Sequence, residues 1–234
     1  MSGERIHQEI TYQRTLNQSL GHVDFADLVF NGRIDRVIEF SELMVKYPPY
    51  DPEFRIQWVA NGVISSDLTA ETLTLMKRAG CQRLIFGIES GSASVLKLMK
   101  KHYDPEVAKR VIRLAYETGI KVTVNFMFGF PGETEDDFLK TLDFIKESGK
   151  YIERAYPSRT YCALEEYSEL YEYPEKFGIK TPFDHHLYWE DKEGENKYPV
   201  RLERCSRFEE FCHSMGVKTD RGVKTAVDLD NWYN

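Results

Sequence analysis

Two segments of this 234-residue chain end an apolar run in a polar turn that contains glycine. The first covers residues 84–92 and reads LIFGIESGS; the second covers residues 124–134 and reads VNFMFGFPGET. Each apolar run is typical of a buried strand, and each turn is followed by a helical pattern. A strand, a turn and a helix in this order place backbone N–H groups and a carboxylate at the carboxyl edge of a parallel sheet, where α/β folds bind ligands. The two turns therefore predict a ligand site.

The residue types that bind metals form no metal-binding motif. The four cysteines have neither CxxC nor CxxxCxxC spacing; they are Cys81, Cys162, Cys205 and Cys212. The last two recur with Phe208 at helical spacing, a stripe that favours packing over metal binding. Residues 184–186, Asp-His-His, have ligand chemistry, but adjacent histidines on a polar loop are more often exposed than metal-bound. We therefore predict no metal site in this chain.

The composition describes an ordered globular protein. Hydrophobic residues make up 41% of the chain and charged residues 29%, and the formal net charge is -7. The negative charge argues against a protein that holds nucleic acid by counterion release, so we expect a small-molecule or protein partner and no nucleic acid. The amino terminus lacks a signal-peptide core, and no apolar run approaches the ~20 residues that span a bilayer. We expect a cytoplasmic protein without membrane contact.

Apolar periodicity and end signals predict alternating strands and helices over the first two thirds of the chain. Helices are expected at residues 3–17, 34–47, 69–80, 92–101, 105–119 and 134–146, and strands at 22–30, 54–59, 83–89, 121–130 and 155–164. Thr69 and Thr134 are placed to cap helices and Gly80 to end one. This alternation predicts a parallel sheet with right-handed crossovers. After about residue 165 the pattern fails, and we expect an irregular extension with one helix at residues 201–215.

At these residues the chain resembles the radical S-adenosylmethionine (SAM) superfamily, and within it the group whose members often carry a cobalamin-binding domain. The resemblance covers about residues 5–213 and depends on motifs in a characteristic order. They are FADLVFNG at 25–32, Trp58, AGC at 79–81, FGIESGS at 86–92, MKK at 99–101 and GFPGET at 129–134. Singly these motifs are weak, but in this order and spacing they are specific.

The resemblance implies an α/β fold: a partial, TIM-like (β/α)6 barrel over residues 1–164, followed by an irregular, helix-containing extension over residues 165–234. Members of the superfamily use a [4Fe-4S] cluster, held by three cysteines in a CxxxCxxC loop after the first strand, to cleave SAM to a 5′-deoxyadenosyl radical. This chain has no such loop. We therefore expect a barrel without its first strand, cluster ligands upstream of this chain, and no activity of the chain alone. Cobalamin and the substrate, a small molecule or a peptide, are left open.

Two hypotheses follow from the resemblance. The first is the SAM-binding core of a radical SAM enzyme, present as a fragment or a late start of a longer reading frame. The second is a cluster-free homologue that binds SAM or a partner without catalysis. A third, an ordinary TIM-like enzyme with a phosphate-binding turn, is disfavoured because no credible nucleophile or base pair accompanies the turn.

The resemblance also implies six cofactor-binding residues and leaves the catalytic residues unassigned. Asp27 would lie near the ammonium group of the methionine part of SAM. Glu89 and Ser90 would line the ribose and methionine part of the pocket. Those expected to pack beside the adenine are Gly129, Phe130 and Pro131.

Each of these residues has a structural alternative. Asp27 could instead cap the turn at residues 31–32. Glu89 ends an apolar strand, and a carboxylate there needs a partner if it is buried, which favours function. The turn at residues 129–132 could be only a tight connection between a strand and a helix. Glu133 is interpreted as a charge that favours the dipole of the following helix. The lysines at residues 100–101 are interpreted as a solvated face.

The strand expected at residues 22–30 has a consequence for association. Without a preceding strand beside it, it presents unpaired backbone groups together with the apolar side chains of Val23, Phe25, Leu28 and Val29. We therefore expect the chain to self-associate through this edge.

Overall fold

The structure is a computed structural model that describes residues 1–49, 55–158 and 161–219. The chain divides into two compact units. Unit 1 consists of Met1–Gly87 and Glu106–Val124, and unit 2 of Ile88–Pro105 and Asn125–Asn234. The boundary predicted at residue 164 stays a prediction.

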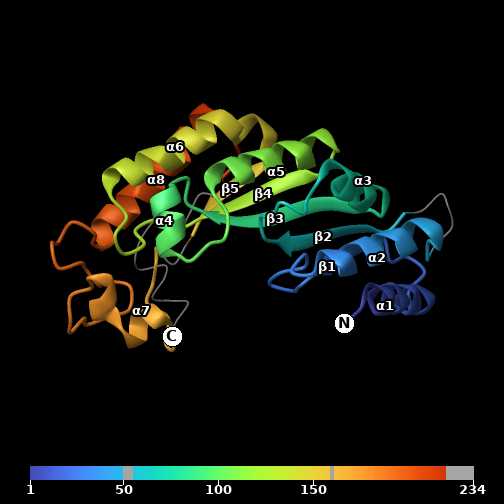
Figure 1. Cartoon of the computed structure of the whole chain (residues 1–234), viewed down its shortest axis with the longest axis horizontal. Helices are drawn as coiled ribbons and strands as arrows, with labels where there is room; N and C mark the ends of the chain where they lie inside the picture. The colour runs from blue at the N-terminus through green and yellow to red at the C-terminus, as the bar shows by residue number, and fades with distance from the viewer. Residues whose placement is uncertain (50–54, 159–160, 220–234) are drawn as a thin grey trace. The chain divides into compact units, whose positions relative to one another are not determined.

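Five strands form one sheet in the order in which they occur in the chain (Figure 1). They are β1 (His22–Phe25), β2 (Gln57–Gly62), β3 (Cys81–Glu89), β4 (Lys121–Phe126) and β5 (Arg154–Pro157). β1 pairs in parallel with β2, and β2 with β3. The predicted parallel α/β fold is therefore confirmed. The carboxyl ends of β3 and β4, and the two turns that follow them, belong to unit 2.

Four helices accompany the strands of unit 1: α1 (Gly3–Leu16), α2 (Ile34–Lys46), α3 (Ala70–Arg78) and α5 (Pro105–Glu117). α1 packs on α2 (Figure 1). The core of this unit contains an aromatic cluster in which Trp58 is fully buried and lies 5.7 Å, ring to ring, from Phe40. The indole N–H of Trp58 donates to the Ala79 carbonyl at 2.9 Å. Trp58 is thus a core residue whose one polar group is satisfied.

The predicted helix ends are confirmed in detail. Thr69 caps α3 with a side-chain oxygen that accepts from the Thr72 N–H, and Gly80 follows the helix with φ +101°. A Cβ at Gly80 would lie 2.2 Å from the Ile56 carbonyl oxygen, so the close approach of two backbone segments requires glycine there.

Unit 2 contains α4 (Ala93–Leu98), α6 (Glu135–Ser148), the one-turn α7 (Glu169–Glu172), α8 (Tyr198–Ser214) and the 3-10 turns η1 (Gly149–Tyr151) and η2 (Pro174–Phe177). α8 corresponds to the helix predicted in the extension and begins earlier, at Tyr198. A hydrophobic core joins the extension to the turn after β4. Its buried members are Val95, Phe130, Cys162, Leu164, Ile179 and Trp189.

Two strands, β1 and β4, end well before their predicted limits, and the prediction was wrong there. β1 ends at Phe25 rather than at residue 30, and β4 at Phe126 rather than at residue 130. Phe30 is buried, yet its N–H donates to the Asn61 carbonyl from a turn. Apolar character predicts burial, and here burial continues beyond the sheet. β2 starts later than predicted, at Gln57. Two short segments in or beside predicted strands lie outside the described residues; they are residues 50–54 and 159–160.

Candidate functional site

A strained glutamate ends β3. Glu89 has φ +64°, in the left-handed region that costs a non-glycine residue about 1–2 kcal/mol, and such strain is concentrated at functional sites. Its Oε1 lies 3.1 Å from the Lys101 Nζ, and the two side chains are 22% and 32% exposed. The interpretation of Lys101 as part of a solvated face was therefore wrong, because it forms a half-buried ion pair. For Lys100 it was right, because that side chain is 67% exposed and pairs at the surface with Glu169.

Neighbouring groups hold the end of β3 in place. The Glu89 carbonyl accepts a hydrogen bond from the Met127 N–H at 2.9 Å. The Tyr103 hydroxyl donates to the Ile88 carbonyl at 2.9 Å. Burial, with a smaller contribution from the Glu89 carboxylate, raises the pKa of Tyr103 well above its usual range, so this hydroxyl keeps its proton at neutral pH. Hydrogen bonds therefore hold the backbone that carries the Glu89 side chain in one position.

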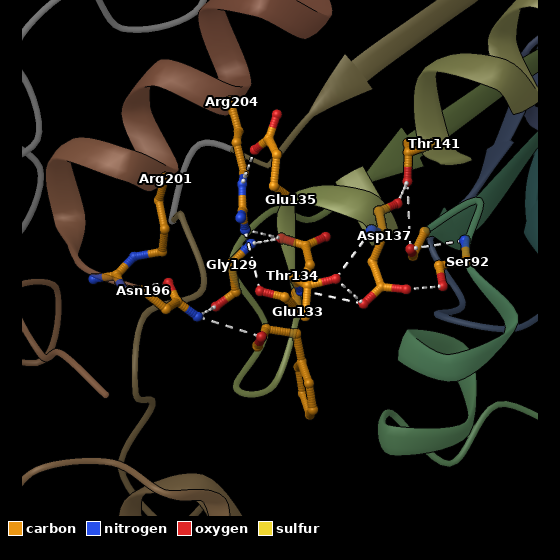
Figure 2. Close-up of polar contacts among 12 residues, drawn as sticks. Ser92, Gly129, Glu133, Thr134, Glu135, Asp137, Thr141, Asn196, Arg201 and Arg204 are labelled. Carbon is orange, nitrogen blue, oxygen red and sulfur yellow. Dashed lines mark hydrogen bonds and ion pairs between the residues drawn. The ribbon is translucent and has the colours of Figure 1, made fainter. Parts of the chain in front are cut away.

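The serines after Glu89 form a closed network with α6 (Figure 2). Ser90 is fully buried, and its Oγ accepts from the Ser92 N–H at 3.1 Å. The Ser92 hydroxyl donates to Asp137 at 2.6 Å, and Asp137 also forms a capping box with Thr134, the residue predicted to cap this helix. Burial alone would raise the pKa of Asp137, but hydrogen bonds from the serines and from Thr134 outweigh it and lower that pKa. The contact of Ser90 with a cofactor stays a prediction.

Gly129 in the turn after β4 is constrained by the extension. It has φ +76°, and a Cβ there would lie 2.2 Å from the Arg201 Cγ. Its N–H donates to Glu133 Oε2 at 2.5 Å, and its carbonyl accepts from the Asn196 side-chain amide at 3.0 Å (Figure 2). Glycine is thus required here by the chain's own packing. Phe130, 9% exposed, faces the core shared with Trp189, and Pro131 is buried; the expected contacts of this turn with adenine stay a prediction.

Glu133 lies just before α6, as its interpretation as a charge that favours the helix dipole requires, and it is also a buried ion-pair partner, which that interpretation did not include. Its side chain is 0% exposed, and its Oε2 lies 2.9 Å from the Arg204 Nη1 (Figure 2). Its Oε1 has no hydrogen-bond partner among the described residues. Burial raises the pKa of Glu133 to about 7 although Arg204 and the Gly129 N–H act to lower it. The Glu133 carboxylate therefore links the turn to α8 through Arg204, while its burial still disfavours its charged form.

Arg201 supports the same turn from α8. It is fully buried, its Nη2 donates to the carbonyls of Leu187 and Trp189 at 2.7 and 3.0 Å, and its guanidinium lies 4.1 Å from the Trp189 ring centroid. Burial lowers the pKa of Arg201 to about 10, so it stays charged at neutral pH. Sequence reasoning missed Asn196, Arg201 and Arg204. The available signal was that both arginines fall on the face of α8 that carries Cys205.

Asp27 belongs to unit 1 and lies on its surface. Its carbonyl accepts from the Asn61 side chain at 3.2 Å, and among the described residues no partner of its carboxylate is found. The nearby turn is instead held by Asn31, which bonds to both backbone groups of Val63 at 2.8 Å. Asp27 lines a cavity of about 460 Å³ with residues of α1 and β1.

The cysteines are placed as core residues. All four are buried, and burial raises the pKa of each thiol, which disfavours the thiolate that binds metals. Within the described ranges, no group of three or more Cys, His, Asp or Glu is arranged to hold a metal ion. The ring centroids of His185 and His186 lie 4.0 Å apart with the rings tilted, and both residues are half-buried rather than exposed. These residues therefore do not fit a [4Fe-4S] cluster. No helix in the part of the chain that the structure describes is long and apolar enough to cross a membrane.

Comparison with known proteins relates the first 145 residues of the chain to one family. The model of the radical SAM superfamily matches residues 1–145 of this chain. Over 118 residues the chain is 31% identical to a tRNA-2-methylthio-N(6)-dimethylallyladenosine synthase of Clostridioides difficile, a match that covers 49% of this chain and 24% of that enzyme. The chain thus spans about a quarter of this curated relative.

Among solved structures the chain is similar to TsrM, a radical S-adenosylmethionine methyltransferase of Kitasatospora setae. With cobalamin and a [4Fe-4S] cluster bound, TsrM matches with a TM-score of 0.59 and 21% identity over 67% of this chain and 28% of that chain. With its tryptophan substrate and a SAM analogue bound, it matches with a TM-score of 0.66 and 16% identity over 88% and 46%. At these identities the likeness shows the fold alone.

Proposed function

The chain belongs to the radical SAM superfamily, and from this premise we propose that it is the SAM-binding core of an enzyme that performs SAM-dependent radical chemistry. The cluster that the superfamily uses would be held by ligands other than the four cysteines described above, since those are dispersed and buried. We propose cobalamin, which one TsrM structure contains, as a further cofactor of the enzyme. The substrate is proposed to be a small molecule or a peptide, in a cytoplasmic setting.

The observation that carries the proposal is the ion pair of Glu89 and Lys101 at the end of β3. SAM carries a carboxylate, an ammonium group and a ribose diol. The Lys101 ammonium group can bind the carboxylate, and the Glu89 carboxylate can accept hydrogen bonds from the ammonium group or from the diol. Both side chains are partly exposed, and the backbone of Glu89 has the kind of strain that occurs at functional sites.

The rest of the site keeps the second turn in shape. Glu133, Asn196 and Arg201 contact Gly129, and Arg204 fixes Glu133. Because these contacts are buried, the turn is preorganised before a ligand arrives. We therefore propose that Glu89 and Lys101 bind the cofactor. The contacts of Asn196, Arg201 and Arg204 with Gly129 and Glu133, called the arginine clamp below, position the neighbouring turn.

We expect Glu89→Gln and Lys101→Gln each to weaken SAM binding at least about tenfold, because each removes a charge-assisted hydrogen bond. Calorimetric titration of the full chain with SAM measures this. Lys100→Gln is the matched control: it changes the neighbouring lysine, which pairs with Glu169, and should leave the affinity unchanged. If wild-type chain released no heat with SAM, or if all three variants bound equally, the assignment of this pair would be wrong.

The buried cysteines favour a second candidate, a cluster-free module that binds SAM without catalysis. The two candidates differ in iron content. The protein purified anaerobically from its own cells, with its intact mass measured, should contain about four iron atoms per chain if it is a radical SAM enzyme with one cluster. Iron at background level in protein that still binds SAM would contradict the enzyme proposal and support the binding module.

A further inference from the structure

The turn after β3 is docked on α6 at two points. The Thr141 hydroxyl oxygen accepts from the Gly91 N–H at 2.9 Å and lies 3.4 Å from Ser90 Oγ. The packing there is close, because a Cβ at Gly91 would lie 2.7 Å from the Thr141 Cα. One helical turn earlier, Asp137 accepts from the Ser92 hydroxyl at 2.6 Å (Figure 2). The helix therefore holds three consecutive residues of this turn.

Asp137 joins this turn to the end of the turn after β4. Its Oδ1 accepts from the hydroxyls of Ser92 and Ser94 at 2.6 and 2.7 Å. Its Oδ2 accepts from the N–H and the hydroxyl of Thr134 at 3.2 and 2.8 Å. Asp137 is 6% exposed, and hydrogen bonds to a charged acceptor are among the strong ones. One carboxylate thus ties both turns to the same helix.

The residue directly before the docked segment needs such support. Glu89 has φ +64°, and a residue other than glycine keeps a left-handed conformation only where its surroundings determine it. On one side, the Glu89 carbonyl accepts from the Met127 N–H at 2.9 Å. The ion pair with Lys101 is partly exposed, so it stabilises this conformation only weakly. The remaining support comes from the residues that follow Glu89.

We propose that Ser92 is a positioning residue of the cofactor site: through Asp137 it holds the turn that keeps Glu89 in the conformation from which its carboxylate binds SAM. The inference rests on the cofactor role proposed above for Glu89. Ser92 is fully buried, and its hydroxyl donates to Asp137. It therefore acts through Glu89 and not by touching a ligand.

Calorimetric titration of the full chain with SAM tests this role. Ser92→Ala should weaken SAM binding about fivefold, because Glu89 then loses part of the support for its conformation. Ser148→Ala is the matched control. It removes another buried serine hydroxyl, which donates to the Phe144 carbonyl at 2.6 Å within α6, and should leave the affinity unchanged. Thermal melting of both variants checks that they remain folded and separates a loss of affinity from a loss of stability.

A double-mutant cycle shows whether Ser92 acts through Glu89. In the Glu89→Gln background the carboxylate is already lost, so Ser92→Ala should weaken SAM binding by less than about twofold further. Two losses that simply multiply would overturn the inference. So would a Ser92→Ala variant that binds SAM as tightly as wild type does.

Amide hydrogen exchange without SAM keeps the inference separate from the proposed function. In Ser92→Ala, but not in Ser148→Ala, the N–H groups of Gly91 and Met127 should exchange about fivefold faster than in wild type, since they bond to Thr141 and to the Glu89 carbonyl. If these rates rose and wild type bound no SAM, the proposed function would be wrong while Ser92 would still support the turn. Unchanged exchange rates would overturn the inference at any SAM affinity.

Discussion

Gly129→Ala is expected to lower the free energy of unfolding of the full chain by about 2–5 kcal/mol. Two effects add. The left-handed φ of +76° disfavours any Cβ, and this Cβ would lie 2.2 Å from Arg201 Cγ and 2.3 Å from its Cδ. Arg201 cannot move aside easily, because its guanidinium is fixed by two carbonyls and by the Trp189 ring. Urea unfolding monitored by fluorescence measures the loss.

A matched control separates the two effects. Gly132, in the same turn, has φ +87°, but a Cβ there would meet the end of the Leu98 side chain at 3.0 Å. Gly132→Ala should therefore cost the backbone term alone, about 1–2 kcal/mol. In a double-mutant cycle, Arg201→Ala should partly relieve Gly129→Ala, since it removes the clashing atoms. Equal losses at both glycines, or strictly additive effects in the cycle, would show that Arg201 does not govern this turn.

Arg204→Ala is expected to destabilise the chain by about 3–5 kcal/mol near pH 8, because it leaves the Glu133 carboxylate buried without its charged partner. The loss should shrink toward pH 5, where Glu133 takes up a proton and no longer needs the arginine. Arg207→Ala is the control on the same helix. That side chain is 37% exposed and pairs with Glu135 at the surface, so its removal should cost less than about 1 kcal/mol.

The pH dependence of the wild-type protein follows from the same group. The pKa of Glu133 is raised to about 7 in the folded chain, from an ordinary value of 4.5. Between these values the folded state holds a proton that the unfolded state has released, so the contribution of Glu133 to stability is greatest below pH 4.5 and falls as pH rises through 7. Glu133→Gln should remove this decline. Unfolding free energies at pH 5 and pH 8 measure it, and an unchanged decline in the variant would assign it to other groups.

Local signals in the sequence were sufficient for the six helices α1 to α6 and for their alternation with strands, but the one-turn α7 in the extension was not predicted. Thr69 and Thr134 cap helices as their neighbours predicted, because a cap depends on residues within three positions. The strand ends were less predictable: Phe30 is as apolar as a strand residue, but its burial comes from a turn. Periodicity reports which side chains are buried and does not report which backbone groups form a ladder.

The arginine clamp could not be found from local signals. No local pattern predicts the burial of Arg201 and Arg204, because buried arginines are rare unless they are paired. Their partners lie far away in sequence: Arg204 bonds to Glu133, and Arg201 to carbonyls of Leu187 and Trp189. Lys101 is a similar case, since its partner Glu89 lies across the turn and α4. Such pairings exist only once the fold has brought the groups together.

The arginine clamp limits which chimeras of this protein can fold. Gly129 and Glu133 lie in the turn after β4, whereas Asn196, Arg201 and Arg204 lie much later in the chain, before and in α8. In a chimera with a foreign extension, Glu133 would be buried without Arg204. Gly129 would also lose Arg201, the side chain that fills the space beside it. An exchange of the extension would therefore have to transfer these five positions as one set.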